Sequence, residues 1–157
     1  NQTGQYLTFT LDNEQYAVDV AKVREVLEYT KVTKVPRMPA FMCGVINLRG
    51  SVVPVIDLRL KFGLKEAEKT INTSIVVMEI SIGEETVVLG ALTDSVNEVV
   101  DFESKDIEPA PKMGTKLDTE FIKGMGKRDD SFIIILDIDK VFTDEELTSE
   151  AIARPSI

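Results

Sequence analysis

Histidine and tryptophan are missing from this chain of 157 residues, and cysteine occurs once, as Cys43. Without histidine, neither a Ser-His-Asp or Cys-His nucleophile nor a histidine-ligated metal site can form. A single cysteine excludes a disulfide within the chain, and its apolar neighbours indicate a buried side chain rather than a reactive thiol. Motifs of paired carboxylates and of phosphate-binding glycines are also missing. The sequence therefore predicts a protein that is not an enzyme and that needs no metal or cofactor.

Basic residues are few, because 18 Lys and Arg stand against 27 Asp and Glu, which makes a formal net charge of −9. This balance opposes nucleic-acid binding, since basic side chains supply most of the affinity for phosphates. Lys31, Lys34 and Arg37 alternate with apolar residues, as on the solvent face of a strand. Signal-peptide patterns and apolar runs of membrane-spanning length are lacking. We expect a cytoplasmic protein without membrane insertion.

The most prominent pattern in the chain is the alternation of apolar and polar residues at a period of two, which is typical of half-buried strands. Residues 6–20 predict two strands joined by a turn. Longer apolar runs predict strands that are buried on both faces, at 51–56, 75–80, 87–92 and 132–136. Helical spacing is confined to short pieces. The sequence therefore predicts a mainly β fold with short helices.

The two halves of the chain repeat each other. Val23-Arg24-Glu25-Val26 returns as Val96-Asn97-Glu98-Val99, and the Phe-x-x-Gly pattern at 41–44, with the apolar run after it, returns 80 positions later. This indicates a tandem duplication of a β unit too small to be stable alone, which argues for a shared core. We expect one domain over 1–157. Its expected subdomains are 15–70, open to a closing strand from the C-terminal part, 74–142, and a helix and tail at 143–157.

The repeat is broken at the turn Asn47-Leu48-Arg49-Gly50, which corresponds to Lys127-Arg128-Asp129-Asp130 in the second half. The fold of the unit therefore does not require Leu-Arg-Gly at this turn. Gly50 is explained by a turn position with a positive φ. Arg49 has no such backbone reason, and a solvated arginine and a functional arginine both remain open.

The segment 41–64, which reads FMCGVINLRGSVVPVIDLRLKFGL, closely resembles the signature of the CheW family, and the match covers nearly the whole chain. The resemblance implies two tandem small five-stranded Src-homology-3-like β-barrels that share a hydrophobic core. It also implies a non-catalytic adaptor that couples methyl-accepting chemotaxis receptors to the histidine kinase CheA in signalling arrays. The implied partners are the cytoplasmic tip of the receptor and the regulatory domain of the kinase.

By the same resemblance, the receptor helix binds in a groove between the barrels, a mode in which apolar anchors of a helix enter an aliphatic cleft. The groove positions are Val23, Val26, Leu27, Val96, Val99 and Val100. For each of them, an ordinary place in the core remains the alternative. The turn and pairing positions are Glu25, Gly44, Asn47, Arg49 and Gly50. We expect Glu25 to pair with Arg49, and we expect a side chain at position 44 to crowd a neighbouring strand or partner. The kinase surface is implied only near 38–41 and 61–62.

Two other interpretations remain. The same module serves as a regulatory domain within a CheA kinase or a CheV protein. In another class, a small-ligand or oligonucleotide-binding β-barrel would require exposed aromatic residues and a basic groove, which suits neither the aromatic content of 6% nor the acidic balance of this chain. Weak self-association through exposed sheet edges also remains open.

Overall fold

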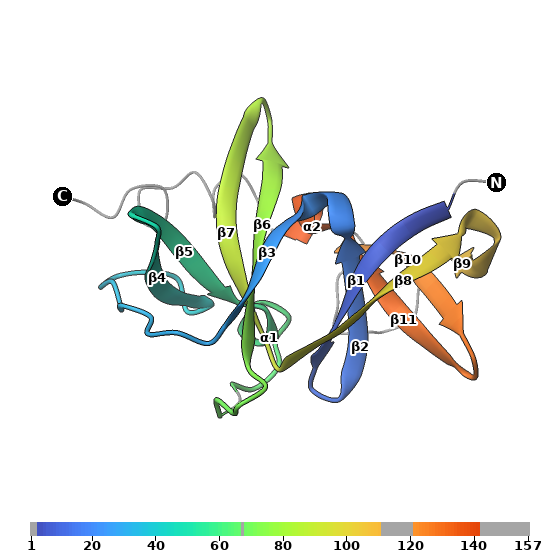
Figure 1. Cartoon of the computed structure of the whole chain (residues 1–157), viewed down its shortest axis with the longest axis horizontal. Coiled ribbons are helices and arrows are strands. Elements are labelled where there is room, and N and C mark those ends of the chain that lie inside the picture. Colours follow the sequence, from blue (N-terminus) through green and yellow to red (C-terminus); the bar gives the residue numbers. More distant parts are fainter. Residues whose placement is uncertain (1–2, 67, 111–120, 142–157) are drawn as a thin grey trace.

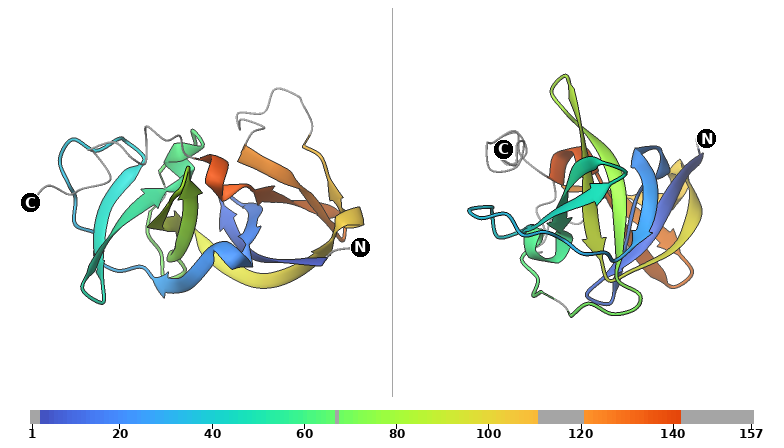
Figure 2. Two further views of the ribbon diagram at one scale, coloured as in Figure 1. Left: turned by 90° about the horizontal axis from the view of Figure 1, so that it is seen from above. Right: turned by 60° about the vertical axis from the view of Figure 1, so that its left-hand side comes forward.

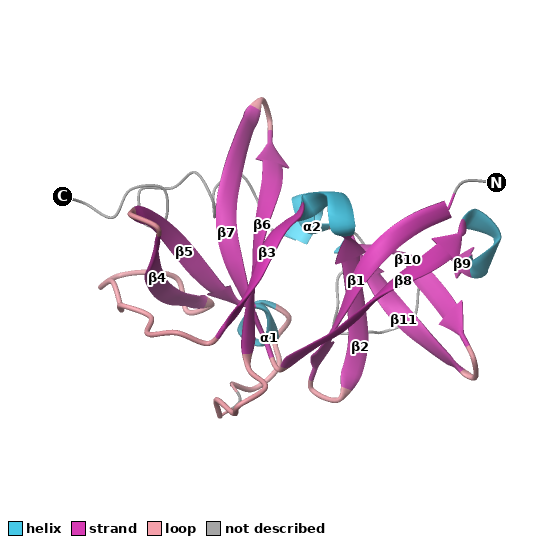
Figure 3. Ribbon diagram, in the orientation of Figure 1, coloured by secondary structure: helices cyan, strands magenta, loops and turns pink. Residues whose placement is uncertain are grey.

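The protein is mainly β, as predicted. The computed structural model describes residues 3–66, 68–110 and 121–141, and within them the chain forms strands joined by short turns and brief helices (Figures 1 and 3). The strands are β1 (Thr3–Leu11), β2 (Glu14–Asp19), β3 (Val23–Glu28), β4 (Met42–Leu48), β5 (Ser51–Asp57), β6 (Ser74–Ile82), β7 (Glu85–Thr93), β8 (Ser95–Glu103), β9 (Ile107–Glu108), β10 (Ile122–Arg128) and β11 (Ser131–Leu136). The α-helices are α1 (Leu58–Lys61) and α2 (Ile138–Val141), and the 3-10 turns are Val20–Lys22 and Ser104–Asp106.

The strands form two sheets, and each sheet curls into a small barrel. The five-stranded barrel has the order β3-β6-β7-β5-β4, and the six-stranded barrel has the order β8-β1-β2-β11-β10-β9. The segment after β3 reaches β4 through a bridge between Thr33 and Val45, and β9 pairs with β10 in the same position of the other barrel. The two-residue strand β9 is therefore the addition to the five strands expected in each barrel.

The barrels do not follow the expected boundaries of 15–70 and 74–142, because the hairpins of the two halves are exchanged. The hairpin β1–β2 opens the chain but pairs with β8 and β11, whereas β6–β7 pairs with β3 and β5. Each exchange includes a parallel pair, β2 with β11 and β7 with β5. Alternation in the sequence shows which face of a hairpin is apolar but not which half of the chain covers it. The expected C-terminal helix at 143–157 lies outside the described residues.

The structure preserves the sequence repeat in detail. A bulge interrupts the pairing of β4 with β5 just before Gly44, and the same bulge precedes Gly124 in the pairing of β10 with β11. The backbone N–H of Asp57 donates to the carbonyl of Phe41 at 2.7 Å, and that of Asp137 donates to the carbonyl of Phe121 at 2.8 Å. Strands 80 positions apart therefore occupy the same places in the two barrels, as a duplication requires.

Three apolar clusters hold the molecule together. One lies inside the six-stranded barrel around Val100 and Ile135, and another lies inside the five-stranded barrel around Val55 and Ile75. The third, the shared core, lies between the barrels and takes buried side chains from both, including Phe9 of β1 and Met78 of β6. Its contributors are Leu7, Phe9, Leu11, Tyr16, Val18, Met42, Ile56, Leu58, Phe62, Val76, Met78, Ile80, Leu89, Ala91, Leu136, Ile138 and Val141. Since full burial of one such side chain is worth about 1.5–3 kcal/mol, neither barrel would retain its stability without the other.

Candidate functional site

β3 and β8 run along the same side of the molecule, one from each barrel (Figures 1 and 2). Along β3, Val23 is partly buried against the shared core, whereas the side chain of Val26 is 44% exposed. Along β8, Val96 is partly buried against the same core, whereas Val99 is 49% exposed. We call these four residues the valine surface. Val26 and Val99 are exposed to solvent, and Val23 and Val96 connect the surface to the shared core.

Two other predicted groove residues point elsewhere. Val100 is only 4% exposed and packs inside the six-stranded barrel with Tyr6 and Phe102, so in this fold it cannot contact a partner. Leu27 is partly buried against the interior cluster of the five-stranded barrel. The alternation of β8 explains the result for Val100, because successive side chains face opposite sides of a strand. Of the adjacent valines at 99 and 100, one must point inward.

The turn 47–50 contains the two-residue hairpin loop between β4 and β5, which is formed by Arg49 and Gly50. The side-chain oxygen of Asn47 accepts a hydrogen bond of 2.8 Å from the backbone N–H of Gly50. Arg49 and Gly50 have φ values of +50° and +89°, which a type I′ turn demands. Gly50 therefore supplies the positive φ that its position predicts, and Asn47 holds the loop closed.

Arg49 occupies a backbone conformation that arginine rarely adopts. At the same position of the other two-residue hairpins stand Asp12, Gly83 and Asp129, with φ values of +53°, +60° and +53°, and these residue types tolerate a left-handed backbone. For an arginine this conformation costs roughly 1–2 kcal/mol. Strain of this kind persists where a side chain has another role, which favours the functional interpretation of Arg49.

Arg49 forms the expected ion pair with Glu25. Its Nη1 donates to Oε1 of Glu25 at 3.3 Å, and its Nη2 donates to Oε2 of the same carboxylate. The pair joins the β4–β5 turn to β3, beside Val26. The hydrogen bond from Arg49 is the main cause that lowers the pKa of Glu25 below its ordinary value. The side chains of Arg49 and Glu25 are 72% and 28% exposed, so the pair contributes orientation more than stability.

An Arg49→Asn substitution is expected to raise the pKa of Glu25 towards its ordinary value, as measured by NMR titration of the side-chain carboxyl. Because pairing lowers the pKa of Glu25 in the folded state, its contribution is present above the ordinary carboxyl pKa and is lost as the pH falls through the folded value. Asn suits the left-handed position, so the turn should persist. Lys105→Asn, which removes an exposed pair with Glu103, is the control. An unchanged titration of Glu25 in the Arg49 variant would mean that the pair does not form in solution.

Gly44 closes the five-stranded barrel through a close backbone approach. Its φ is +143°, and a Cβ at this position would lie 2.1 Å from the carbonyl oxygen of Thr33. Thr33 and Val45 exchange two backbone hydrogen bonds of 2.8 Å at this point. A side chain at position 44 would therefore collide with a neighbouring strand, which is the first of the two expectations for this residue.

A cavity of about 380 Å³ lies beside this closure and is lined by Met38, Cys43 and Asp57, among others. Burial raises the pKa of the Cys43 thiol to about 11, so little reactive thiolate forms at neutral pH. In the segments that the resemblance links to the kinase, Phe62 is buried in the shared core, and Met38 and Phe41 pack against it. The Lys61 ammonium lies 4.9 Å from the centre of the Phe41 ring.

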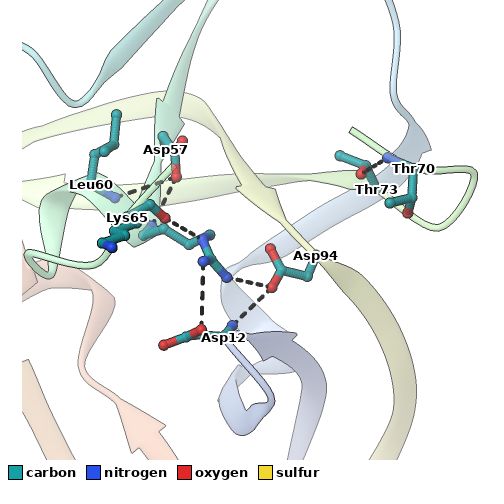
Figure 4. A network of polar contacts seen from close by, with 8 residues as sticks. Asp12, Asp57, Leu60, Lys65, Thr70, Thr73 and Asp94 are labelled. Atoms are coloured by element: carbon teal, nitrogen blue, oxygen red, sulfur yellow. Dashed lines mark hydrogen bonds and ion pairs between the residues drawn. The ribbon is translucent and has the colours of Figure 1, made fainter. Parts of the chain in front are cut away.

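Arg59, which no sequence pattern singled out, joins the two barrels. Its guanidinium, in α1 of the five-stranded barrel, lies 2.7 Å from Asp94 and 3.5 Å from Asp12. Asp94 directly precedes β8, and Asp12 lies in the β1–β2 turn; Figure 4 shows both carboxylates converging on the same guanidinium. We call this set the Arg59 clamp.

A second set of contacts, the Asp139 clamp, repeats this arrangement with opposite charges. The carboxylate of Asp139, in α2 of the six-stranded barrel, lies 2.6 Å from the Lys22 ammonium and accepts a 2.8 Å hydrogen bond from the backbone N–H of Ser81. Lys22 directly precedes β3, and Ser81 lies near the end of β6. Arg59 and Asp139 are 80 positions apart. Their opposite charges hide the equivalence from a search for repeated residues.

Comparison with known proteins assigns the fold and the sequence to a family. The family model described as the CheW-like domain matches residues 5–146. The chain belongs to the CheW-like family. Its sequence is similar to Chemotaxis protein CheW of Klebsiella aerogenes, with 38% identity over 143 residues, which are 91% of this chain and 84% of that protein. Chemotaxis protein CheW of Bacillus subtilis is 34% identical over 153 residues, which are 96% of this chain and 94% of that protein.

The structure is similar to the crystal structure of the scaffolding protein TtCheW from Thermoanaerobacter tengcongensis. The TM-score is 0.80 at 37% sequence identity, over 90% of this chain and 93% of that one. The predicted fold class is therefore confirmed, and the chain belongs with the scaffold and adaptor proteins of chemotaxis. In the part of the chain that the structure describes, neither four-residue helix could cross a membrane.

Proposed function

We propose that this protein couples methyl-accepting chemotaxis receptors to the histidine kinase CheA, and that the receptor's cytoplasmic helical tip docks on the valine surface. The observation that carries the proposal is the exposure of Val26 and Val99, 44% and 49%, on β3 and β8, which are edge strands of two different barrels. An amphipathic helix recognises its partner by burying a stripe of apolar residues. A contiguous patch of exposed apolar side chains marks a site where a protein partner binds.

The base of the surface suits a helix that lies across both barrels. Val23 and Val96 rest on the shared core, so they are supported from below and move little when a partner docks. Preorganised apolar walls reduce the entropy cost of binding. Leu27, which packs against the interior of the five-stranded barrel, and the buried Val100 are both left out of the proposal.

The Glu25–Arg49 pair ties the turn 47–50 to β3, the strand that carries Val23 and Val26. We infer that the pair holds the turn in the geometry that binds the receptor or the kinase. The cost of a left-handed backbone at Arg49 supports this role, since asparagine would adopt the same backbone conformation at a lower cost.

The experiment that tests the function is a pull-down followed by calorimetry, with the purified regulatory domain of CheA and, separately, a receptor signalling-tip fragment. Binding to both partners is expected. Single-stranded DNA is the control ligand, and the net charge of −9 predicts no binding to it. Binding to neither protein would leave the family and the fold in place and would remove the proposed coupling of receptor to kinase at a cytoplasmic array.

Charge reversal tests the pair directly. Glu25→Arg and Arg49→Glu are each expected to weaken binding to a receptor or kinase fragment, because each single reversal places like charges together. The double reversal restores the pair and should recover a substantial part of the affinity, measured by calorimetry. Thermal stability should change little in all three variants, since an ion pair at the protein surface contributes little to stability. A double variant that binds no better than either single one would contradict the pairing role.

A further inference from the structure

All three guanidinium nitrogens of Arg59 make contacts in the Arg59 clamp. The side chain of Arg59 is only 12% exposed, and its Nε donates to the carbonyl of Lys65 at 2.6 Å while its terminal nitrogens contact Asp94 and Asp12. Arginine presents its donors in a rigid planar fork, so it fixes the direction of every partner. The position of Asp94 relative to α1 is therefore tightly defined.

Asp94 in turn fixes the start of β8. Its Oδ2 accepts a 2.8 Å hydrogen bond from the backbone N–H of Asp12, and its own N–H donates to the carbonyl of Thr10 at 3.0 Å. The next residues along the chain lead directly to Val96 and Val99. One half of the valine surface thus begins at a residue that is held by a helix of the opposite barrel.

The Asp139 clamp fixes the start of β3, the strand that carries the other half of the valine surface. Lys22, held by Asp139 of α2, is directly followed by Val23 at the start of β3. The hydrogen bond from Ser81 ties the same carboxylate to the β6–β7 hairpin. Each strand that carries the valine surface is therefore anchored to the barrel to which it does not belong.

From this arrangement we propose that the two clamps set the angle between the barrels, and that Arg59 and Asp139 are positioning residues that keep β3 and β8 at the separation a docked helix requires. The proposal rests on the proposed function of the valine surface. The shared core already holds the barrels together, but apolar burial is non-directional and permits small rotations. Charged hydrogen bonds depend on direction and restrict such rotations. A helix about 10 Å wide needs both walls at a constant distance.

The test combines binding with a distance measurement in the full chain. Arg59→Met removes the fork at similar length, and Arg59→Lys keeps the charge but not the fork. Affinity for a receptor signalling-tip fragment is measured by calorimetry. Spin labels at Val52→Cys and Phe132→Cys, in a Cys43→Ala background, report the distance between the barrels by pulsed electron resonance. Both labelled side chains are exposed and lie on equivalent strands of the two barrels.

We expect Arg59→Met to weaken binding by roughly tenfold, a typical effect for residues that couple regions without touching the ligand. The distribution of inter-label distances should broaden, and Arg59→Lys should lie between the parent and Arg59→Met in both measurements. Lys22→Met, which breaks a pair whose side chains are 31% and 29% exposed, gives a second variant if Arg59→Met folds poorly. Lys105→Met, which removes an exposed pair within the six-stranded barrel, is the control and should change neither measurement.

Each outcome decides the proposal. A broadened distribution with unchanged affinity would overturn the positioning role and leave the proposed function intact. Reduced affinity with an unchanged, narrow distribution would mean that Arg59 acts on the partner directly, which also overturns it. A parent protein that binds no receptor fragment would overturn the proposed function, and the positioning role with it.

Discussion

Val99→Asp is expected to reduce affinity for a receptor signalling-tip fragment by about a hundredfold or more, which corresponds to about 2.7 kcal/mol. A docked helix would cover the new carboxylate, which would then lose its water without gaining a partner. The side chain of Val99 is 49% exposed in the free protein, so the melting temperature should not fall appreciably. Calorimetry measures the affinity, and thermal unfolding followed by circular dichroism shows whether the fold is kept.

Matched variants separate the surface from the fold. Val52→Asp places the same carboxylate on another exposed valine, 57% accessible and on β5, and should leave receptor binding unchanged. Val100→Asp alters the adjacent residue, which is 4% exposed, and should unfold the six-stranded barrel. If Val99→Asp binds the receptor fragment as tightly as the parent does, the valine surface is not the docking site.

Gly44→Ala is expected to lower the free energy of unfolding by roughly 3–5 kcal/mol, the combined effect of an unfavourable backbone conformation and a steric collision. The new Cβ would lie 2.1 Å from the carbonyl oxygen of Thr33. A backbone oxygen held by two hydrogen bonds cannot move aside without opening the barrel closure. Urea unfolding, followed by circular dichroism, measures the loss.

The duplication supplies the control for this prediction. At the equivalent Gly124, a Cβ would lie 2.4 Å from the Cγ2 atom of Ile107 and 3.2 Å from the carbonyl oxygen of Glu108. A side chain can shift where a backbone cannot, so Gly124→Ala should cost only roughly 1–2 kcal/mol. Equal losses for the two variants would contradict the role assigned to the approach of Gly44 to Thr33.

Much of the site could be predicted because its signals are local. The turn at Asn47–Gly50 follows from a polar stretch between two apolar runs. The pairing of Glu25 with Arg49, 24 positions apart, is not a local signal: it is expected from the resemblance to the CheW family, and the structure joins the two side chains by two hydrogen bonds. The clamps could not be predicted in this way. Arg59 and Asp94 are 35 positions apart, and Lys22 and Asp139 are 117 apart. Their contacts exist only because the barrels pack together, and no local pattern specifies how they pack.

The sequence by itself determined the mainly β class, because the alternation of apolar and polar side chains is written in neighbouring residues. It also determined the duplication, because matched motifs return at a constant spacing. The resemblance of the segment 41–64 to the signature of the CheW family indicated the family, which the family model confirms. Only the tertiary structure decided that the hairpins β1–β2 and β6–β7 are exchanged between the halves. It also decided that Val99 faces solvent while Val100 faces the core. A strand's alternation defines two faces, but the choice between them, and the choice of partner strand, depends on which distant apolar surfaces are available to be buried together.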